Sequence, residues 1–310
     1  METGASPAPE SPAGAEVPAD FATPSRALST CTIAVVGLGL MGGSLAGALK
    51  GHCHKVVGVD PATTAREGAL SCGYVDRATA SLAEGVRDAD VVVLAAPVRT
   101  IIQLIGTIGP LLSPGTVLMD LGSTKTDVLA AMAGLPSHVQ PLGGHPMCGK
   151  ETSGIAAADP ELFRGRTFIL SPLARTSTGT LALGKALVQA VGARPLVIDG
   201  PRQDYLVATL SHLPYLLACA LISTADATTS NDPLAWEIIA GGFRDTSRVA
   251  GSDVTMMVDI LTTNREEVLK AARSCLTHLE RLIGLVDHGD AGQLQDVLSR
   301  IRDTRKEMYP

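Results

Sequence analysis

Two short stretches of the sequence contain residues suited to binding a phosphate and to moving a proton. The first is Gly37-x-Gly39-x-x-Gly42, a spacing that lets backbone N–H groups approach a pyrophosphate. The second is GGHPMCG, in which His145 lies between a glycine pair and Pro146. An imidazole titrates close to neutral pH, so a histidine at such a position can take a proton from a ligand. Together the two stretches indicate nucleotide binding combined with proton transfer.

The glycine stretch lies between segments that are typical of a βαβ unit. An apolar, β-branched run begins at Thr32, a helical pattern follows the glycines, and a second apolar run, KVVGVD, ends at Asp60. Gly37 permits the tight turn, Gly39 the approach of the pyrophosphate and Gly42 the close packing of the helix, whose N-terminus faces the negative charge. Asp60 follows Gly42 at a spacing close to that at which a carboxylate binds a ribose 2′-hydroxyl. A dinucleotide-binding site is predicted.

Further apolar runs predict the rest of a sheet. They are DVVVLAAP (90–97), TVLMDLGS (116–123), VQPLGG (139–144), TFILSP (167–172) and PLVIDG (195–200). Helical patterns separate most of these runs, and strands without polar positions indicate a parallel sheet covered by helices on both faces. Ligands bind beyond the carboxyl ends of such strands. We therefore expect Pro97, Ser123 and His145 to meet at one cleft.

The sequence after Asp199 contains no further β-run and predicts an all-α domain. Apolar residues recur at helical spacing over 203–227 and again over 253–289. The expected organisation is a disordered tail (1–29), a Rossmann-type dinucleotide-binding domain (30–200) and a helical substrate and dimerisation domain (201–310). The apolar content of the last exceeds what a domain of about 110 residues needs for its own core, so a homodimer joined through these helices is expected.

Composition argues against several other classes of protein. A formal net charge of −6 with 3% aromatic residues provides no basic, aromatic surface for nucleic acid. The first 29 residues lack a secretory signal, and the apolar run 213–222 has ten residues where a membrane span needs about 20. The cysteines form no CxxC pair, and Gly51-His52-Cys53-His54 has no partner cluster, so no metal site is expected. A soluble protein of the reducing cytoplasm is predicted.

Several motifs, in their order along the chain, resemble the prephenate/arogenate dehydrogenases of tyrosine biosynthesis. They are VVGLGLMGGSLAGALK, DLGSTKTDV, GGHPMCGKETSGI, LSHLPYLLACAL and GGFRDTSRVAGSD, and the resemblance runs from about residue 31 to 287. It implies oxidative decarboxylation of a cyclohexadienyl acid with hydride transfer to a nicotinamide. Asp60 favours NAD as the cofactor, because its carboxylate would repel the 2′-phosphate of NADP.

Departures from the family pattern leave the substrate open. Met257 and Val258 stand where many members have a tryptophan followed by an arginine, and Val254 replaces a proline. Prephenate is the first expectation, and arogenate or aminodeoxyprephenate the alternative. A non-catalytic dinucleotide-sensing protein is the alternative from another class, although such a sensor needs none of the residues that resemble the family's active site.

The resemblance also implies roles for individual residues. His145 is expected to accept the carbinol proton with a pKa near its ordinary value of about 6.5, the alternative being a histidine hydrogen-bonded in a turn. Ser123 is expected to hydrogen-bond the reacting hydroxyl, although it also suits a helix N-cap. His212 and Arg248 resemble the residues that hold substrate carboxylates. The alternative for His212 is a core histidine, and that for Arg248 is a surface charge. Glu151 is expected to close the site. Dinucleotide contacts are expected from Gly37, Gly39, Leu40, Met41, Gly42, Asp60 and Pro97.

Overall fold

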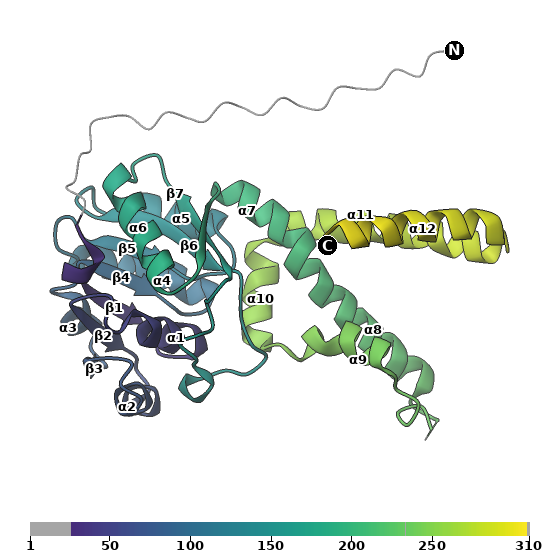
Figure 1. Cartoon of the computed structure of the whole chain (residues 1–310), viewed down its shortest axis with the longest axis horizontal. Helices are drawn as coiled ribbons and strands as arrows, with labels where there is room; N and C mark the ends of the chain where they lie inside the picture. The colour runs from purple at the N-terminus through teal and green to yellow at the C-terminus, as the bar shows by residue number, and fades with distance from the viewer. Residues whose placement is uncertain (1–25, 233, 309–310) are drawn as a thin grey trace, which may run out of the picture.

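The computed structural model describes residues 26–232 and 234–308, which form a sheet part and a helical part (Figure 1). The sheet part consists of η1 Leu28–Thr30, β1 Thr32–Val36, α1 Leu40–Leu49, β2 Lys55–Val59, α2 Thr63–Ser71, β3 Arg77–Thr79, α3 Leu82–Val86, β4 Val91–Leu94, α4 Val98–Ile108, η2 Gly109–Leu111, β5 Val117–Asp120, α5 Thr126–Ala133, β6 Gln140–Pro146, η3 Ile155–Ala157, β7 Thr167–Pro172, α6 Thr178–Ala190 and β8 Arg194–Val197. The helical part consists of α7 Gly200–Val207, η4 Ala208–His212, α8 Leu213–Thr229, α9 Gly241–Ser247, η5 Arg248–Gly251, α10 Val254–Thr263, α11 Arg265–Asp287 and α12 Ala291–Met308.

The sheet has the strand order β3-β2-β1-β4-β5-β6-β7-β8. The expected parallel pairing holds throughout except between β6 and β7, which are antiparallel. A parallel neighbour needs a crossover that returns the chain to the starting edge. Between β6 and β7 the only regular element is the single turn η3, so the chain turns back directly. The loop that results lies at the end of β6, immediately after His145 and Pro146.

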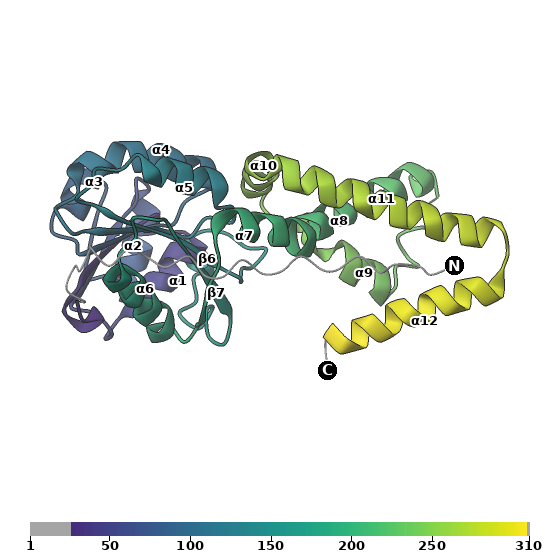
Figure 2. The same ribbon diagram turned by 90° about the horizontal axis from the view of Figure 1, so that it is seen from above.

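Alternate residues of the strands face two apolar cores, one on each side of the sheet. In β1, Ile33 and Val35 belong to one core, whereas Ala34 and Val36 belong to the other. Figure 2 shows α1 and α6 on one face and α4 and α5 on the other. Burial on both faces is the reason that most strand positions are apolar. The short strand β3 escaped prediction because it has three half-buried or exposed residues and no apolar run.

Residues just before the first strand are anchored to the sheet part. Arg26 forms an ion pair with Asp90, and η1 begins at Leu28, whose side chain packs against the core. The disordered tail expected over residues 1–29 is therefore wrong for residues 26–29, and residues 1–25 lie outside the described part of the chain.

The helical part begins with one continuous helix, Gly200–Thr229, that combines α7, η4 and α8. The turn η4 is a π-helix, and it immediately precedes Pro214 near the start of α8. Proline lacks the N–H that an α-helix would use here, and π-turns are one way in which a helix accommodates such a break. The wide turn carries His212 on the side of the helix that faces the sheet part.

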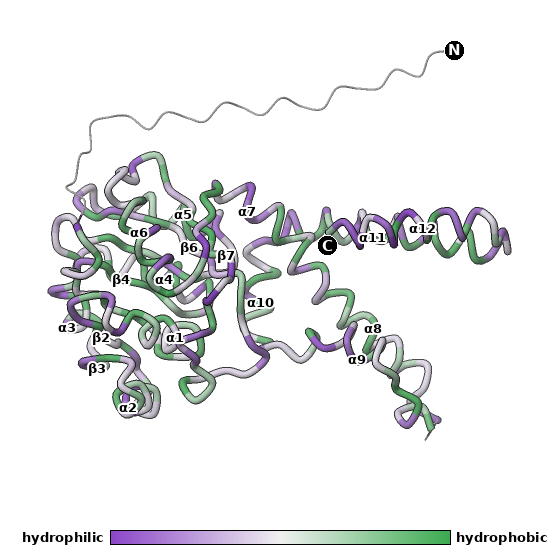
Figure 3. The backbone as a smooth tube through the Cα atoms, in the orientation of Figure 1, coloured by the Kyte–Doolittle hydropathy of each residue, from purple (hydrophilic) through white to green (hydrophobic). Residues whose placement is uncertain are grey.

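The helical part exposes many large apolar side chains. Figure 3 shows hydrophobic residues, coloured green, along α8 and along the overlapping α11 and α12. The exposed side chains include Leu210, Leu217, Leu269, Leu276, Leu279, Ile283, Leu298 and Ile301. Within the described residues, Gly200–Thr229 is also the one helix long and apolar enough to cross a membrane, a property that the ten-residue run alone did not reveal. An apolar surface of this extent on a chain calls for a partner surface.

Candidate active site

The glycine turn between β1 and α1 leaves space for a phosphate at the carboxyl end of the sheet. Gly37 has a φ of +97°, and a Cβ there would lie 2.3 Å from the carbonyl oxygen of Ala95. A Cβ on Gly42 would lie 1.9 Å from the carbonyl oxygen of Gly37, whereas one on Gly39 would meet nothing within 4 Å. Gly39 is the N-cap of α1 and has no side chain to satisfy the first N–H groups. These donors are therefore available to an anion.

Asp60 lies directly beside this turn. Its Oδ2 accepts the backbone N–H of Leu38 at 2.8 Å, and its Oδ1 accepts that of Ala62 at 2.8 Å. The nearby Arg66 donates instead to the carbonyl oxygens of Asp60 and Pro61, at 2.7 and 2.8 Å. Among the described residues the carboxylate thus has no guanidinium partner, and it retains lone pairs for a ribose hydroxyl.

A cavity of about 420 Å³ opens where the sheet part meets the helical part. Four of the residues with predicted chemical roles, Ser123, His145, Glu151 and His212, line it together with the predicted dinucleotide contacts Leu40 and Met41. Arg248, Asp60 and Pro97 are not among its lining residues. The rest of the wall is Leu121, Pro146, Met147, Cys148, Gly149, Lys150, Leu210, Ser211, Tyr215, Val249, Ser252, Met256, Met257 and Ile260.

His145 is a buried residue of β6, and only 7% of it is exposed. It pairs with Ile169 in the antiparallel ladder, so it does not lie in a turn, and its Nδ1 is buried without a hydrogen-bond partner among the described residues. Burial lowers the pKa of His145 to about 3, and the charges of Lys125 and His212 act in the same direction. The expectation of a pKa near 6.5 is therefore wrong, because the sequence did not reveal the burial. At neutral pH the imidazole is uncharged, and Nε2 is the nitrogen left to meet a ligand.

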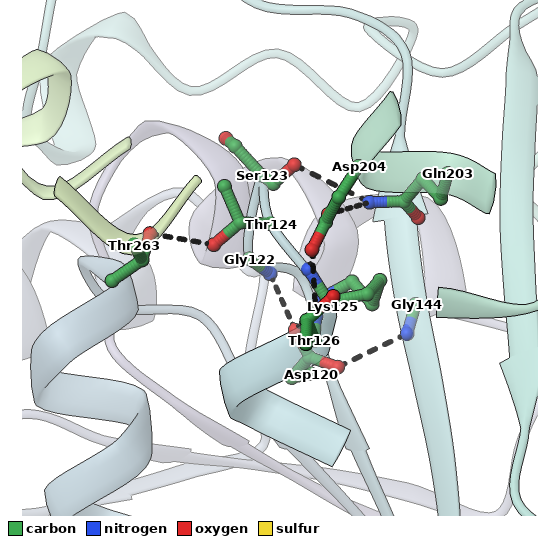
Figure 4. Close-up of polar contacts among 10 residues, drawn as sticks. All are labelled: Asp120, Gly122, Ser123, Thr124, Lys125, Thr126, Gly144, Gln203, Asp204 and Thr263. Atoms are coloured by element: carbon green, nitrogen blue, oxygen red, sulfur yellow. Dashed lines mark hydrogen bonds and ion pairs between the residues drawn. The ribbon is translucent and has the colours of Figure 1, made fainter. Parts of the chain in front are cut away.

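A buried ion pair, Lys125 and Asp120, lies beside Gly144, the residue that precedes His145 (Figure 4). The side chains of Lys125 and Asp120 are fully buried and bonded to each other, and Asp120 also accepts the N–H groups of Gly122 at 2.7 Å and Gly144 at 3.1 Å. The pair joins the end of β5 to β6 next to the histidine. Sequence reasoning missed it, although the signal was present as an aspartate that ends an apolar run five residues before a lysine.

Ser123 lies in the loop between β5 and α5, and its hydroxyl has no hydrogen bond within the part of the chain described. The interpretation of Ser123 as a helix N-cap is wrong, because α5 begins only at Thr126. The N-terminus of α5 is capped instead by Asp204 of α7, whose two carboxylate oxygens accept the N–H groups of Lys125 and Thr126 at 2.8 Å each. Gln203 donates to the carbonyl oxygen of Ser123 at 3.3 Å. The helical part thereby positions the serine loop (Figure 4).

His212 is buried, as its interpretation as a core histidine predicts, and it also lines the cavity. Only 1% of it is exposed, and burial lowers its pKa to about 4. Its Nδ1 lies 3.2 Å from the side-chain nitrogen of Asn264. Sequence reasoning did not single out Asn264, whose part depends on a contact between segments 52 residues apart.

Arg248 and Glu151 form an ion pair at the rim of the cavity. Their side chains are 63% and 45% exposed, so the pair is open to solvent. Glu151 belongs to the loop after β6, and Arg248 begins η5 in the helical part. Arg248 and Glu151, one from each part of the molecule, thus meet at the mouth of the cavity.

Asp259 of α10 makes a further link between the two parts. Its carboxylate accepts the N–H of Arg99 at 3.1 Å, near the N-terminus of α4 that follows Pro97. Met257, one of the positions that departs from the family pattern, lines the cavity, whereas Val258 and Val254 are exposed. No group of three or more potential metal ligands occurs in residues 26–232 and 234–308, His52 and Cys53 included.

Comparison with known proteins agrees with this architecture. Residues 45–197 match the model of the prephenate dehydrogenase nucleotide-binding domain, and residues 200–300 match that of the prephenate dehydrogenase dimerization domain. A prephenate dehydrogenase of Bacillus subtilis is 32% identical over 278 residues, which cover 88% of this chain and 75% of that protein.

Two solved structures share the whole fold. The prephenate dehydrogenase from A. aeolicus, in complex with hydroxyphenyl propionate and NAD+, has a TM-score of 0.85 and 30% identity and covers 91% of this chain and 100% of that one. The Synechocystis arogenate dehydrogenase has a TM-score of 0.75 and 30% identity and covers 89% of this chain and 99% of that one. By both domain models and by these relatives, the chain belongs to the prephenate dehydrogenase family.

Proposed function

We propose that this protein is an oxidoreductase that converts prephenate to 4-hydroxyphenylpyruvate and CO₂ with NAD as the oxidant. The observation that carries the proposal is that a neutral His145 and the free hydroxyl of Ser123 line the same cavity as Leu40, the first residue of the helix after the glycine turn. A proton acceptor and a dinucleotide site thus share one space. NAD, when bound, supplies the hydride acceptor.

The chain's own residues have three tasks in this reaction. His145 accepts the proton of the ring carbinol through Nε2 as hydride leaves the same carbon, and Ser123 hydrogen-bonds the carbinol oxygen. Loss of the ring carboxylate as CO₂ then aromatises the ring, and His145 returns its proton to the phenolate oxygen. The net reaction turns a dianion and NAD+ into a monoanion, CO₂ and NADH, so charge balances. Decarboxylation needs no further group because aromatisation drives it.

The charges of the cavity favour prephenate over arogenate. Glu151 is the one carboxylate among the described lining residues, and it is already paired with Arg248. The ammonium group of arogenate would have to share Glu151 with Arg248, whereas the keto acid side chain of prephenate needs no anionic partner. An unsatisfied polar group costs about 1–3 kcal/mol, which corresponds to roughly 5- to 150-fold in kcat/KM.

The deciding experiment incubates the purified protein with NAD or NADP and each of prephenate, arogenate and aminodeoxyprephenate, and follows NADH or NADPH absorbance. The highest kcat/KM is expected with prephenate and NAD. A higher value with arogenate would refute the substrate assignment, as would turnover of aminodeoxyprephenate alone. Binding of NAD without turnover of any of the three would favour the dinucleotide-sensing alternative.

We further propose that two copies associate through the helical part, in the cytoplasm. The match to a dimerization domain and the exposed apolar side chains of α8, α11 and α12 support this assembly. Light scattering of the purified chain should give twice its mass of 31.9 kDa. A monomer at micromolar concentration would refute this assembly. Partition of the protein into membranes would indicate instead that Gly200–Thr229 is a membrane-spanning helix.

A further inference from the structure

Asn264, between α10 and α11, directs its side chain toward the active site and away from its own helix. It is the N-cap residue of α11, a position at which asparagine normally accepts a helix N–H, yet it makes no capping bond. Only 4% of it is exposed. Its Nδ2 lies 2.8 Å from the carbonyl oxygen of Asp204 and 3.2 Å from Nδ1 of His212. The amide therefore joins α7 to the cavity histidine.

The carbonyl oxygen of Asp204 determines which end of the amide faces His212. A carbonyl oxygen only accepts hydrogen bonds, so the amide atom next to it must be the NH₂ group. One hydrogen of that group points to Asp204, which leaves the second for Nδ1 of His212. Nδ1 must then accept. A neutral imidazole whose Nδ1 accepts carries its proton on Nε2.

The protonated nitrogen is the one left for the ligand. His212 lines the cavity, and its Nδ1 is occupied by Asn264, so Nε2 is the nitrogen available there. An Nε2–H group donates a hydrogen bond and cannot take a proton. This gives the two cavity histidines different capacities, because His145 has no partner on Nδ1 that fixes its tautomer.

We propose that Asn264 is a positioning residue that holds His212 as an Nε2–H donor aimed at a carboxylate oxygen of the substrate. His145 is then the one proton acceptor of the pair, and His212 contributes to binding without competing for the carbinol proton. The identity of the substrate rests on the proposed function. The tautomer does not, since it is a property of the protein without substrate.

The first test is the tautomer of His212 in the wild-type protein. Long-range ¹H–¹⁵N correlation spectra of protein labelled with ¹⁵N-histidine distinguish the nitrogen that carries the proton, and the His212 signals are assigned by their loss in His212→Gln. A single Nε2–H form near pH 7 is expected. An Nδ1–H form or a mixture would overturn the proposal, and this result does not depend on any variant's stability or on turnover.

Variants of Asn264 then test the consequence for substrate binding. Asn264→Ala should mix the tautomers and raise KM for prephenate about tenfold, while kcat stays within about threefold, since one hydrogen bond to a charged group is lost. Asn264→Asp presents acceptors in place of the NH₂ group, so it should favour the Nδ1–H form and raise KM further. The neighbouring Arg265→Gln, an exposed position at the same helix start, is the matched control and should leave KM unchanged.

A double variant separates action through His212 from a purely structural effect. In a His212→Gln background, Asn264→Ala should change KM by less than about twofold, because the route through the imidazole is already gone. An equal rise in KM in both backgrounds would mean that Asn264 acts only through Asp204, and would overturn the proposal. A wild-type Nε2–H form in a protein that fails to oxidise prephenate would instead refute the proposed function and leave the tautomer assignment intact.

Discussion

The carboxylate of Asp204 in the helical part accepts the backbone N–H of Lys125 at 2.8 Å in the sheet part. With a second bond from the N–H of Thr126 to the same carboxylate, the helix that begins the helical part caps α5 and holds the loop that carries Ser123. The same loop contains the lysine that pairs with Asp120 beside Gly144, the residue that precedes His145. The groups proposed for chemistry are therefore held from both sides of the domain junction, and a change on either side is expected to reach them.

Lys125→Met should destabilise the fold strongly. It leaves the carboxylate of Asp120 buried without its cation, and breaking a buried pair in this way costs about 3–5 kcal/mol. Asp120→Asn combined with Lys125→Met removes both charges and should recover most of the loss. Urea unfolding of the single and double variants measures the difference. A single variant as stable as the wild type would mean that the pair is not charged in the folded state.

His145→Asn should lower kcat by roughly 10²- to 10⁴-fold, the usual contribution of a general base. Asparagine keeps hydrogen-bonding capacity but takes no proton, so KM for prephenate should change little. Steady-state kinetics with saturating NAD provide the measurement. Activity within a few-fold of the wild type would remove His145 from the chemistry and leave it a buried strand residue.

The free energy of unfolding should decrease on acidification below about pH 6.5. Burial lowers the pKa of His145 to about 3 and that of His212 to about 4, whereas both titrate near 6.5 in the unfolded chain. Between these values the unfolded chain binds more protons, so unfolding becomes easier as pH falls. Urea midpoints at pH 7.5 and 4.5 measure the effect.

Carboxylates also titrate in that range, so the comparison with a variant isolates the histidine contribution. His212→Gln should lose less stability between the two pH values than the wild type does. His52→Asn, at an exposed loop position, is the matched control and should follow the wild type. Identical pH dependence in all three proteins would contradict the assignment of neutral, buried histidines.

The elements of the fold could be predicted where neighbouring residues form a recognisable pattern. Residues of the site could be predicted only where they belong to a sequence motif. The turn from Gly37 to Gly42 and the strands with unbroken apolar runs follow directly from residue type. The antiparallel pairing of β6 and β7 was not predictable, because the sequence of the loop between them does not specify in which direction the next strand runs.

The supporting residues of the site were missed for a different reason. Asp204 and Asn264 are polar residues of a helical pattern, and each acquires its part from a partner distant in the sequence. The shifted pKa of His145 has the same origin. Burial is a property of the packed chain, whereas a motif records only the type and order of its residues.

Arg248→Ala should raise KM for prephenate by roughly 10- to 100-fold, since a charge-assisted hydrogen bond contributes about 1.5–3 kcal/mol. Arg248→Lys should recover only part, because lysine cannot form two parallel bonds to a carboxylate. The Kd of NAD should remain constant in both variants. Glu151→Gln frees the guanidinium from its present partner and should lower KM or leave it unchanged. An unchanged KM in Arg248→Ala would reduce the residue to a surface charge paired with Glu151.

Asp60 should make the wild-type enzyme prefer NAD over NADP by at least roughly tenfold in kcat/KM, because a 2′-phosphate would approach a carboxylate that has no guanidinium partner within the described part of the chain. Asp60→Asn removes the charge but keeps one acceptor for the N–H of Leu38 or Ala62, so the glycine turn should survive. In that variant kcat/KM with NADP should rise, because Arg66 of α2 is held beside Asp60 by its contacts with the carbonyl oxygens of Asp60 and Pro61. Adding Arg66→Ala should cancel the gain with NADP and leave kcat/KM with NAD nearly constant. Equal use of the two cofactors by the wild type would contradict this role of Asp60, and a gain with NADP that persists without Arg66 would assign the phosphate contact to another group.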